Sequence, residues 1–282
     1  MVRTLFTAMG CAKCKIVKRF MDEKGIVFEE ADIKGNGKDA FRKFYGAHRK
    51  DIVRGREGIE FPVLSYGNIV RQGLSVILSY LVGGMDLEGF IGRNEMTAGW
   101  IGGIHLSKGD PSSADDLAYL LGYLKKNGFR LQLETNGKNA SVLARMLQEN
   151  LGDRVYMEVL GPVRLYDILL GEEIEAGEIE KSVSLVNKFP EYAFYTTVAP
   201  ILRQKDEKPK IAYLSPDEIG ETAEFISKVT GSSQEPYVLK IFDPETSTNE
   251  MMKNVPKMAG NEMFKHRTAA RRYQRKTEIE KE

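Results

Sequence analysis

Residues 2–21 read VRTLFTAMGCAKCKIVKRFM, in which an apolar run leads into a Cys-x-x-Cys pair and then into a helical pattern. The run over 2–8 predicts a strand. The stretch after the pair predicts an amphipathic helix, because its apolar residues recur on one face: Ile16, Val17, Phe20 and Met21. At the start of a helix, backbone N–H groups and the helix dipole stabilise a thiolate, the form of cysteine that attacks disulfides.

Cys11 and Cys14 are the only two cysteines in 282 residues. We expect Cys11 to attack a disulfide and Cys14 to resolve the mixed disulfide, with the charge of Lys13 further favouring the thiolate. Three other roles stay open for the pair: inert structural thiols, a zinc site completed from outside, and a [2Fe–2S] cluster held by two thiolates from each chain of a dimer. The sequence offers no second cysteine pair for zinc and only three histidines: His48, His105 and His266.

The rest of the first 82 residues alternates between strand and helix patterns. We expect a strand over 27–33, a charged helix over 39–53 with Phe41, Phe44 and Tyr45 inward, a short strand from Phe61, a turn at Tyr66-Gly67-Asn68, a return at Ile69-Val70 and a helix over 72–81. The sequence therefore predicts a compact domain over 1–82. Gly83-Gly84 marks its end, and residues 83–100 form a connector.

A second pattern fills residues 101–245. Five apolar, strand-like runs are separated by helical stretches: 104–107, 131–134, 155–160, 193–198 and 237–242. Strands that alternate with helices predict an α/β domain with a parallel sheet, open or curled into part of a barrel. Residues 246–282 are predicted to be a charged helical tail, whose basic residues suit a solvated helix face better than an RNA-binding surface.

The N-terminal motifs resemble those of glutaredoxins over roughly residues 1–82. A Cys-x-x-Cys pair follows the first strand, Phe61-Pro62-Val63 stands where that family carries its cis-proline tripeptide, and Gln72-Gly73 precedes the last helix. The resemblance implies a thioredoxin/glutaredoxin fold, with glutathione or another thiol as reductant. It implies that residues facing the dithiol bind the thiol substrate: Lys13, Phe61, Pro62, Gln72 and Gly73. Ala12 stands where many members have proline.

Motifs over roughly residues 100–245 resemble radical S-adenosylmethionine enzymes, in particular the activating enzymes of glycyl-radical proteins such as anaerobic ribonucleotide reductase. Four stretches match in order: Ser107-Lys108-Gly109-Asp110-Pro111, Glu134-Thr135-Asn136-Gly137, Tyr195-Thr196-Thr197-Val198-Ala199-Pro200 and Leu239-Lys240-Ile241-Phe242-Asp243-Pro244. The resemblance implies a partial (β/α) barrel. It also implies a pocket for S-adenosylmethionine, for which the candidate residues are Ser107, Gly109, Asp110, Thr135 and Asn136.

Departures from that family argue for lost radical chemistry. Its [4Fe–4S] cluster needs three cysteines of a Cys-x-x-x-Cys-x-x-Cys loop, and this sequence has no such loop. The first of the family's six strands, which precedes that loop, is also missing from the five predicted here. Pocket positions differ too: Lys108 replaces a glycine, Asp110 a glutamate, Leu160 a lysine and Tyr195 an arginine. We expect no metal site and no iron–sulfur cluster within one chain, and treat the adenosyl pocket as vestigial.

The predicted function is a thiol–disulfide oxidoreductase carried on a cluster-less, activating-enzyme-like docking module. Its expected partner is a protein, either a glycyl-radical enzyme or the activase of one. Two alternatives stay open: a radical enzyme whose cluster ligands are completed by another chain, and a non-catalytic adaptor. The oligomeric state is not predicted.

Composition agrees with a soluble protein. Charged residues make up 29% and apolar residues 42% of the chain, and the formal net charge is +1, which gives no global field to attract nucleic acid or a membrane. No apolar run approaches the roughly 20 residues of a membrane helix. The N-terminus does not resemble a signal peptide. A single cysteine pair without a disulfide framework makes the cytoplasm the expected compartment.

Overall fold

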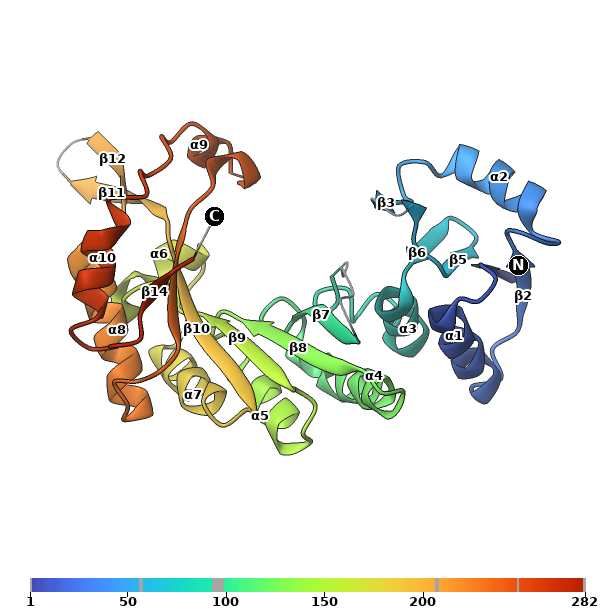
Figure 1. The fold of residues 1–282 in the computed structure, drawn as a ribbon, viewed down its shortest axis with the longest axis horizontal. Coiled ribbons are helices and arrows are strands. Elements are labelled where there is room, and N and C mark those ends of the chain that lie inside the picture. The colour runs from blue at the N-terminus through green and yellow to red at the C-terminus, as the bar shows by residue number, and fades with distance from the viewer. Residues whose placement is uncertain (1, 56–57, 93–98, 206–207, 248, 281–282) are drawn as a thin grey trace. The chain divides into compact units, whose positions relative to one another are not determined.

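The computed structural model describes residues 2–55, 58–92, 99–205, 208–247 and 249–280. The chain divides into two compact units, residues 1–131 and 132–282, which are drawn in Figure 1. The division falls inside a strand, Arg130–Thr135. Residues 93–98 of the predicted connector lie outside the described residues, and the predicted domain boundaries stay predictions. Among the described residues, no helix is both long and apolar enough to cross a membrane.

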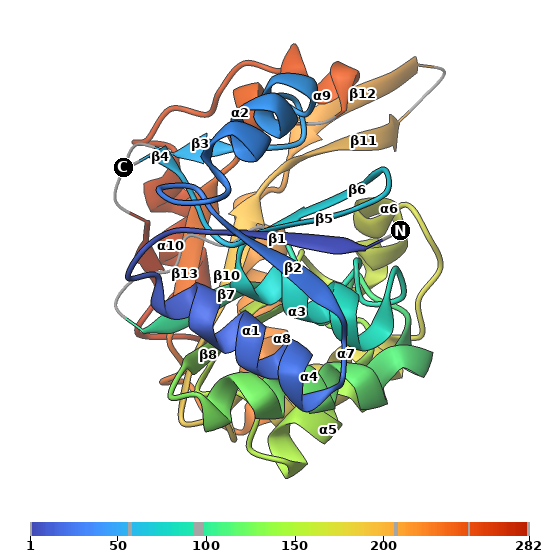
Figure 2. The ribbon, with the colours of Figure 1, turned by 90° about the vertical axis from the view of Figure 1, so that its right-hand side faces the viewer.

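The first unit begins with a four-stranded sheet in the order β2-β1-β5-β6. β1 is parallel to β2 and antiparallel to β5, and β5 is antiparallel to β6. Helix α2 lies on one side of this sheet, and α1 and α3 lie on the other (Figure 2). The bounds are β1 Arg3–Thr7, α1 Ala12–Glu23, β2 Phe28–Asp32, α2 Lys38–Ala47, β5 Val63–Tyr66, β6 Ile69–Gln72 and α3 Leu74–Gly83.

Aromatic packing holds α2 against the sheet. The ring of Phe6 on β1 lies 5.2 Å from that of Phe41 and 4.8 Å from that of Phe44, between centroids. Phe6 is buried in a cluster with Ile52 and Val63. The predicted inward face of this helix is therefore confirmed, although the helix ends at Ala47 and not at residue 53.

A small hairpin that the sequence did not predict follows α2. Its strands are β3 (Arg54–Gly55) and β4 (Gly58–Ile59), and they pair antiparallel. Each strand is only two residues long, which is too short to show the alternating apolar pattern that predicts a strand. The hairpin leads directly to Glu60 and Phe61, and these two residues lie beside the cysteine pair.

Residues 85–92 pack into the first unit. Leu87 and Phe90 are fully buried, and Gly92 donates its N–H to the carbonyl oxygen of Gly103 at 2.8 Å. The unit continues with β7 (Trp100–His105), the short 3-10 turn η1 (Pro111–Ser113) and α4 (Ala114–Lys126). α4 buries the apolar stripe that its i, i+3, i+4, i+7 spacing forms, since all four of its leucines are buried: Leu117, Leu120, Leu121 and Leu124.

The larger sheet has six strands in the order β14-β13-β10-β9-β8-β7. The pairings from β8 to β14 are parallel. The five predicted strands are confirmed, and the count is corrected to six, because the C-terminal segment adds β14 at the edge. The strands after β7 are β8 Arg130–Thr135, β9 Arg154–Glu158, β10 Glu191–Val198, β13 Tyr237–Ile241 and β14 Glu278–Ile279.

Helices of the second unit line one face of these strands. α5 packs against α7, α7 against α8, and α8 against α10 (Figure 1). α8 begins at a capping box, with the side chain of Ser215 accepting a hydrogen bond from the N–H of Glu218 and with Pro216 in the first turn. The bounds are α5 Ala140–Gln148, η2 Val163–Leu165, α6 Tyr166–Leu170, α7 Ala176–Val186, α8 Pro216–Thr230, η3 Pro244–Thr246, α9 Glu250–Lys253 and α10 Met263–Ala270.

The second unit also contains an unpredicted hairpin. β11 (Pro200–Lys205) and β12 (Lys208–Tyr213) pair antiparallel over six residues. It directly follows the apolar strand β10. By the resemblance, residues 195–200 match one strand motif; in the structure β10 ends at Val198, and Pro200 begins this separate two-stranded ribbon.

Candidate dithiol site

Cys11 and Cys14 form a disulfide at the start of α1, with their Cα atoms 5.3 Å apart. Cys11 is the N-cap residue of the helix, and its sulfur accepts a hydrogen bond from the N–H of Cys14 at 3.1 Å. Cys14 is 2% exposed, whereas Cys11 is half-buried. An incoming sulfur therefore has access to Cys11, and the same N–H would stabilise the thiolate of Cys11 once the disulfide is reduced.

The chain before Phe61 and Pro62 forms the opposite wall of the site. The Phe61–Pro62 peptide bond is cis, and the carbonyl oxygen of Phe61 lies 3.8 Å from the sulfur of Cys11. Pro62 is buried, and its carbonyl oxygen accepts a hydrogen bond from the N–H of Gly73 at 3.0 Å. Phe61, Pro62 and Gly73 are thus brought together beside the cysteine pair.

Lys13 lies between the two cysteines and forms an ion pair. Its Nζ lies 2.6 Å from Oε1 of Glu60, and the two side chains are 29% and 39% exposed. The sequence predicts that the charge of Lys13 favours the Cys11 thiolate, and no local pattern indicates Glu60 as the partner of Lys13. Because a carboxylate neutralises the ammonium at short range, the field of Lys13 at Cys11 is weaker than the sequence alone suggests.

The side chain of Gln72 holds the backbone next to the cysteine pair in place. Its Nε2 donates to the carbonyl oxygens of Val53 at 2.9 Å and Glu60 at 3.1 Å, and its Oε1 accepts from the N–H of Val53 at 2.8 Å. These bonds commit the Gln72 amide to the backbone of Val53 and Glu60 and give it a positioning role, and its predicted contact with a thiol substrate stays a prediction. Gly73 next to it has a φ of +90°, which side-chain-bearing residues rarely adopt.

The first-unit residues of the candidate adenosyl pocket have structural tasks. Asp110 caps η1 by accepting a hydrogen bond from the N–H of Ser112 at 2.9 Å, and this bond lowers the pKa of the Asp110 carboxyl. A Cβ on Gly109 would meet the ring of Phe90 at 2.2 Å, so only glycine fits there. Ser107 is buried at the end of β7.

The second-unit residues of the same prediction form a tight turn after β8. Thr135 accepts from the N–H of Gly137 at 3.1 Å, and Asn136 accepts from the N–H of Lys138 at 3.2 Å. The carbonyl oxygen of Gly137 accepts from the hydroxyl of Ser182 at 2.7 Å. These bonds shape the loop itself, and a pocket that joins Thr135 and Asn136 to the first-unit residues stays a prediction.

A polar cluster lies near the carboxyl ends of β9, β10 and β13. The sequence predicts Tyr195 as a pocket position, but it does not predict which residues gather around it. Thr197 donates to Oε1 of Glu158 at 2.6 Å. The ammonium of Lys240 lies 4.3 Å from the ring centroid of Tyr195 and 3.2 Å from Oε1 of Glu280. Burial, followed by the charge of Glu158, raises the pKa of Tyr195. The available signal was alternation, since these residues interleave with the buried apolar residues of their strands.

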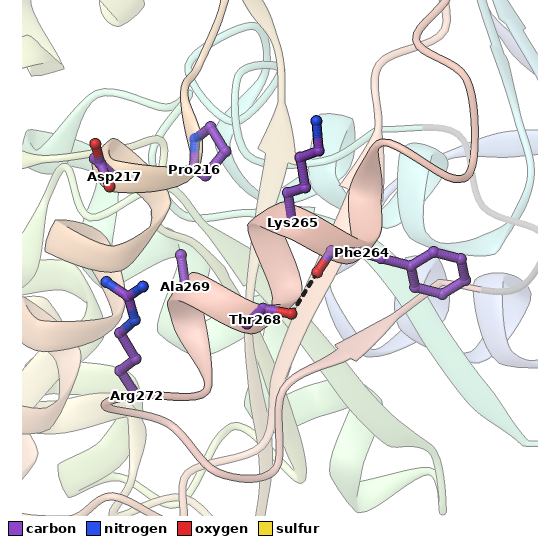
Figure 3. Close-up of a pocket in the computed structure, with 7 residues that line it drawn as sticks. All are labelled: Pro216, Asp217, Phe264, Lys265, Thr268, Ala269 and Arg272. Atoms are coloured by element: carbon purple, nitrogen blue, oxygen red, sulfur yellow. Dashed lines mark hydrogen bonds between the residues drawn. The ribbon is translucent and has the colours of Figure 1, made fainter.

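An open cavity of about 420 Å³ lies between the start of α8 and α10. It is lined by Pro216, Asp217, Phe264, Lys265, Thr268, Ala269 and Arg272 (Figure 3). The long side chains point in different directions, and the hydroxyl of Thr268 is committed to the carbonyl oxygen of Phe264 at 2.8 Å. The cavity therefore lacks the convergent polar groups of a small-molecule site.

Comparison of the chain with models of known protein families finds no match, and comparison with curated protein sequences finds no significant match. Within the described residues, no group of three or more His, Cys, Asp and Glu side chains is arranged to hold a metal ion. The interpretation of the cysteine pair as a reactive site therefore depends on its geometry alone. It combines an accessible sulfur, a protected sulfur three residues later and a stabilising N–H donor.

Proposed function

We propose that this protein is a thiol–disulfide oxidoreductase whose active dithiol is Cys11 and Cys14. The observation that carries the proposal is the unequal exposure of two sulfurs that lie within bonding distance, with Cys11 half-buried and Cys14 buried. This arrangement supports different roles for the two sulfurs: the accessible one reacts with the substrate, and the buried one resolves the mixed disulfide.

The reaction proceeds in two exchanges. The Cys11 thiolate attacks one sulfur of a substrate disulfide, forms a Cys11–substrate disulfide and releases the other sulfur as a thiolate, which takes up a proton. Cys14 gives up its proton and attacks the Cys11 sulfur, which releases the second substrate thiol and forms the Cys11–Cys14 disulfide. Two electrons and two protons pass from protein to substrate. A thiol reductant, glutathione or another thiol, returns the pair to the dithiol.

The fold of the first 82 residues supports a thioredoxin/glutaredoxin assignment. The sheet order β2-β1-β5-β6, the helix that starts at the cysteine pair and the proline opposite it are the parts that this assignment requires. We assign the protein to the cytoplasm, where thiols are kept reduced and a dithiol of this kind can cycle.

The remainder of the chain is proposed to be a docking module derived from a radical S-adenosylmethionine barrel. Parallel strands from β8 to β13 support this origin. Asp110 and Gly109 serve the local fold, which supports the loss of the adenosyl site. The module would present the dithiol to a protein partner, which we propose is a glycyl-radical enzyme or its activase.

A single-turnover assay tests the proposed activity. Protein reduced with dithiothreitol and then desalted should reduce one equivalent of bis(2-hydroxyethyl) disulfide and end as the Cys11–Cys14 disulfide, as mass spectrometry reports. Cys11→Ser should abolish the reaction. Cys14→Ser should stop at the mixed disulfide on Cys11, because no resolving thiol remains. Equal rates for wild type and Cys11→Ser would refute the activity.

A second candidate function is small-ligand binding by the polar cluster of Glu158, Tyr195, Thr197 and Lys240. The observation that favours it is position, since open α/β sheets bind ligands at the carboxyl ends of their strands. Calorimetry with S-adenosylmethionine tests this candidate. Binding that Glu158→Gln weakens would support it, and the absence of heat with wild-type protein would remove it.

A further inference from the structure

The ion pair between Lys13 and Glu60 lies inside the proposed dithiol site, and neither side chain forms or breaks a bond in the proposed exchange. We propose that Glu60 sets the charge preference of this site: by neutralising Lys13 it disfavours anionic disulfides such as oxidised glutathione, and it favours disulfides carried by neutral or cationic groups. This inference rests on the proposed oxidoreductase function, and it narrows the substrate to a class.

Lys13 is the basic group closest in sequence to both sulfurs, and its ammonium is already occupied. The 2.6 Å contact with Glu60 is a charge-assisted hydrogen bond. A substrate carboxylate could bind Lys13 only by displacing Glu60 or by approaching a second negative charge. Both routes penalise an anionic substrate. The next basic residue, Lys15, is exposed to solvent, where salt screens its field.

Glu60 is held in place by its own backbone. Its carbonyl oxygen accepts the hydrogen bond from Gln72, and the next residue, Phe61, contributes the carbonyl oxygen that lies 3.8 Å from the Cys11 sulfur. On its other side, the Glu60 carboxylate approaches Gly73, where a Cβ would lie 3.6 Å from Oε2. The backbone of Glu60 is therefore fixed beside the cysteine pair, and its carboxylate lies against Lys13, where an incoming disulfide meets its charge.

A matched control exists on the same helix. Lys18 of α1 pairs with Glu30 at 2.9 Å, and these side chains are 31% and 40% exposed, nearly the same as in the Lys13–Glu60 pair. Glu30 lies on β2, and its carboxylate accepts hydrogen bonds from Lys18 and from the hydroxyl of Thr7, neither of which belongs to the dithiol site. Substituting Glu30 removes the carboxylate partner of a lysine of α1, as substituting Glu60 does, but leaves the residues beside the cysteine pair unchanged.

Single-turnover rates with three disulfides test the inference: anionic oxidised glutathione, cationic cystamine and neutral bis(2-hydroxyethyl) disulfide. Rates relative to the neutral disulfide cancel any general change in the reactivity of Cys11. Glu60→Gln should raise the relative rate with oxidised glutathione about fivefold at low salt and lower that with cystamine by a similar factor, as expected for one charge near a half-buried site. Glu30→Gln should leave both relative rates within twofold.

Two further measurements separate a charge effect from a structural one. In 0.5 M KCl the difference between wild type and Glu60→Gln should shrink severalfold, because salt screens the field. The double variant Lys13→Gln/Glu60→Gln should lose the gain with oxidised glutathione, because the unmasked ammonium is gone. If Glu60→Gln reduces all three disulfides with unchanged relative rates, the inference is wrong and the oxidoreductase function stands. If wild type reduces none of them, the oxidoreductase function fails.

Discussion

At the residue scale, the surroundings of each charged group decide what it contributes. Lys13 and Glu218 illustrate this in two different sites. Lys13 is partly exposed and shares its charge with Glu60, whereas Glu218 is buried and is bound by Arg203 through two contacts, at 2.8 and 2.6 Å. The first arrangement bears on reactivity, and the second bears on stability.

Glu218 predicts a specific acid sensitivity. Burial opposes ionisation, but the hydrogen bonds from Arg203 and the N–H of Ser215 outweigh it and lower the pKa from 4.5 to about 2. The folded state therefore gains from this carboxylate above about pH 4.5, and the gain is lost as the pH falls toward 2. A lowering of this size corresponds to roughly 3 kcal/mol.

Urea unfolding of wild type and Glu218→Gln at pH 7, 4 and 3 checks this prediction. At pH 7 the variant should be less stable by about 2–3 kcal/mol, and the difference should narrow as the pH falls. Glu221→Gln is the control, because its partner Arg164 is 55% exposed, and it should change the stability by less than about 0.5 kcal/mol. A pH-independent difference for Glu218→Gln would contradict the assignment.

At the element scale, close backbone approach fixes the loop after β7. The position of Gly109 beneath Phe90 leaves no room for a Cβ, at 2.2 Å from the ring, and Phe90 is fully buried. The ring therefore cannot swing into solvent to make room, and the loop needs glycine at this position whether or not it binds any ligand.

A pair of glycine substitutions tests this point. Gly109→Ala should destabilise the protein by about 1–3 kcal/mol, because the added methyl overpacks a closed site. Gly46→Ala is the matched change in α2, where nothing lies within 4 Å of the new Cβ, and it should stabilise by up to about 1 kcal/mol. Thermal unfolding followed by circular dichroism reports both. A neutral Gly109→Ala would show that the loop relaxes freely.

At the scale of the whole molecule, the C-terminal segment takes part in the second unit's core. β14 extends the sheet at β13, and Gln274 and Thr277 are completely buried. Gln274 accepts from the N–H of Glu235 at 3.0 Å and donates to the carbonyl oxygen of Ser232 at 2.8 Å. Because these contacts join residues far apart in the chain, the segment acts as a structural part of this unit.

Removal of residues 271–282 should therefore lower the thermal unfolding midpoint by at least about 5 °C, since it strips an edge strand and two buried polar contacts. Lys276→Ala is the control within the same segment; its side chain is exposed, so the midpoint should stay within about 2 °C. A truncated protein with an unchanged midpoint would mean that β14 contributes nothing to stability.

The strands of the larger sheet with several apolar residues were predictable, and the two-residue pairings were not. β8 and β9 alternate buried apolar residues with partly buried or exposed ones, and β10 and β13 are rich in aromatic and branched residues, which are patterns typical of strands. β14 is two residues long within a charged segment, and β3 and β4 are equally short. Such two-residue strands are stabilised by the strand they pair with, so the local sequence does not predict them.

The same distinction applies to the dithiol site. By itself the sequence determined that two sulfurs meet at the start of a helix, because a spacing of three residues leaves little choice. Only the tertiary structure decided which sulfur is protected, that Gln72 braces the wall and that Glu60 pairs with Lys13 across 47 positions of sequence. Which distant residues come into contact depends on how the whole chain folds, and a local sequence pattern does not contain that information.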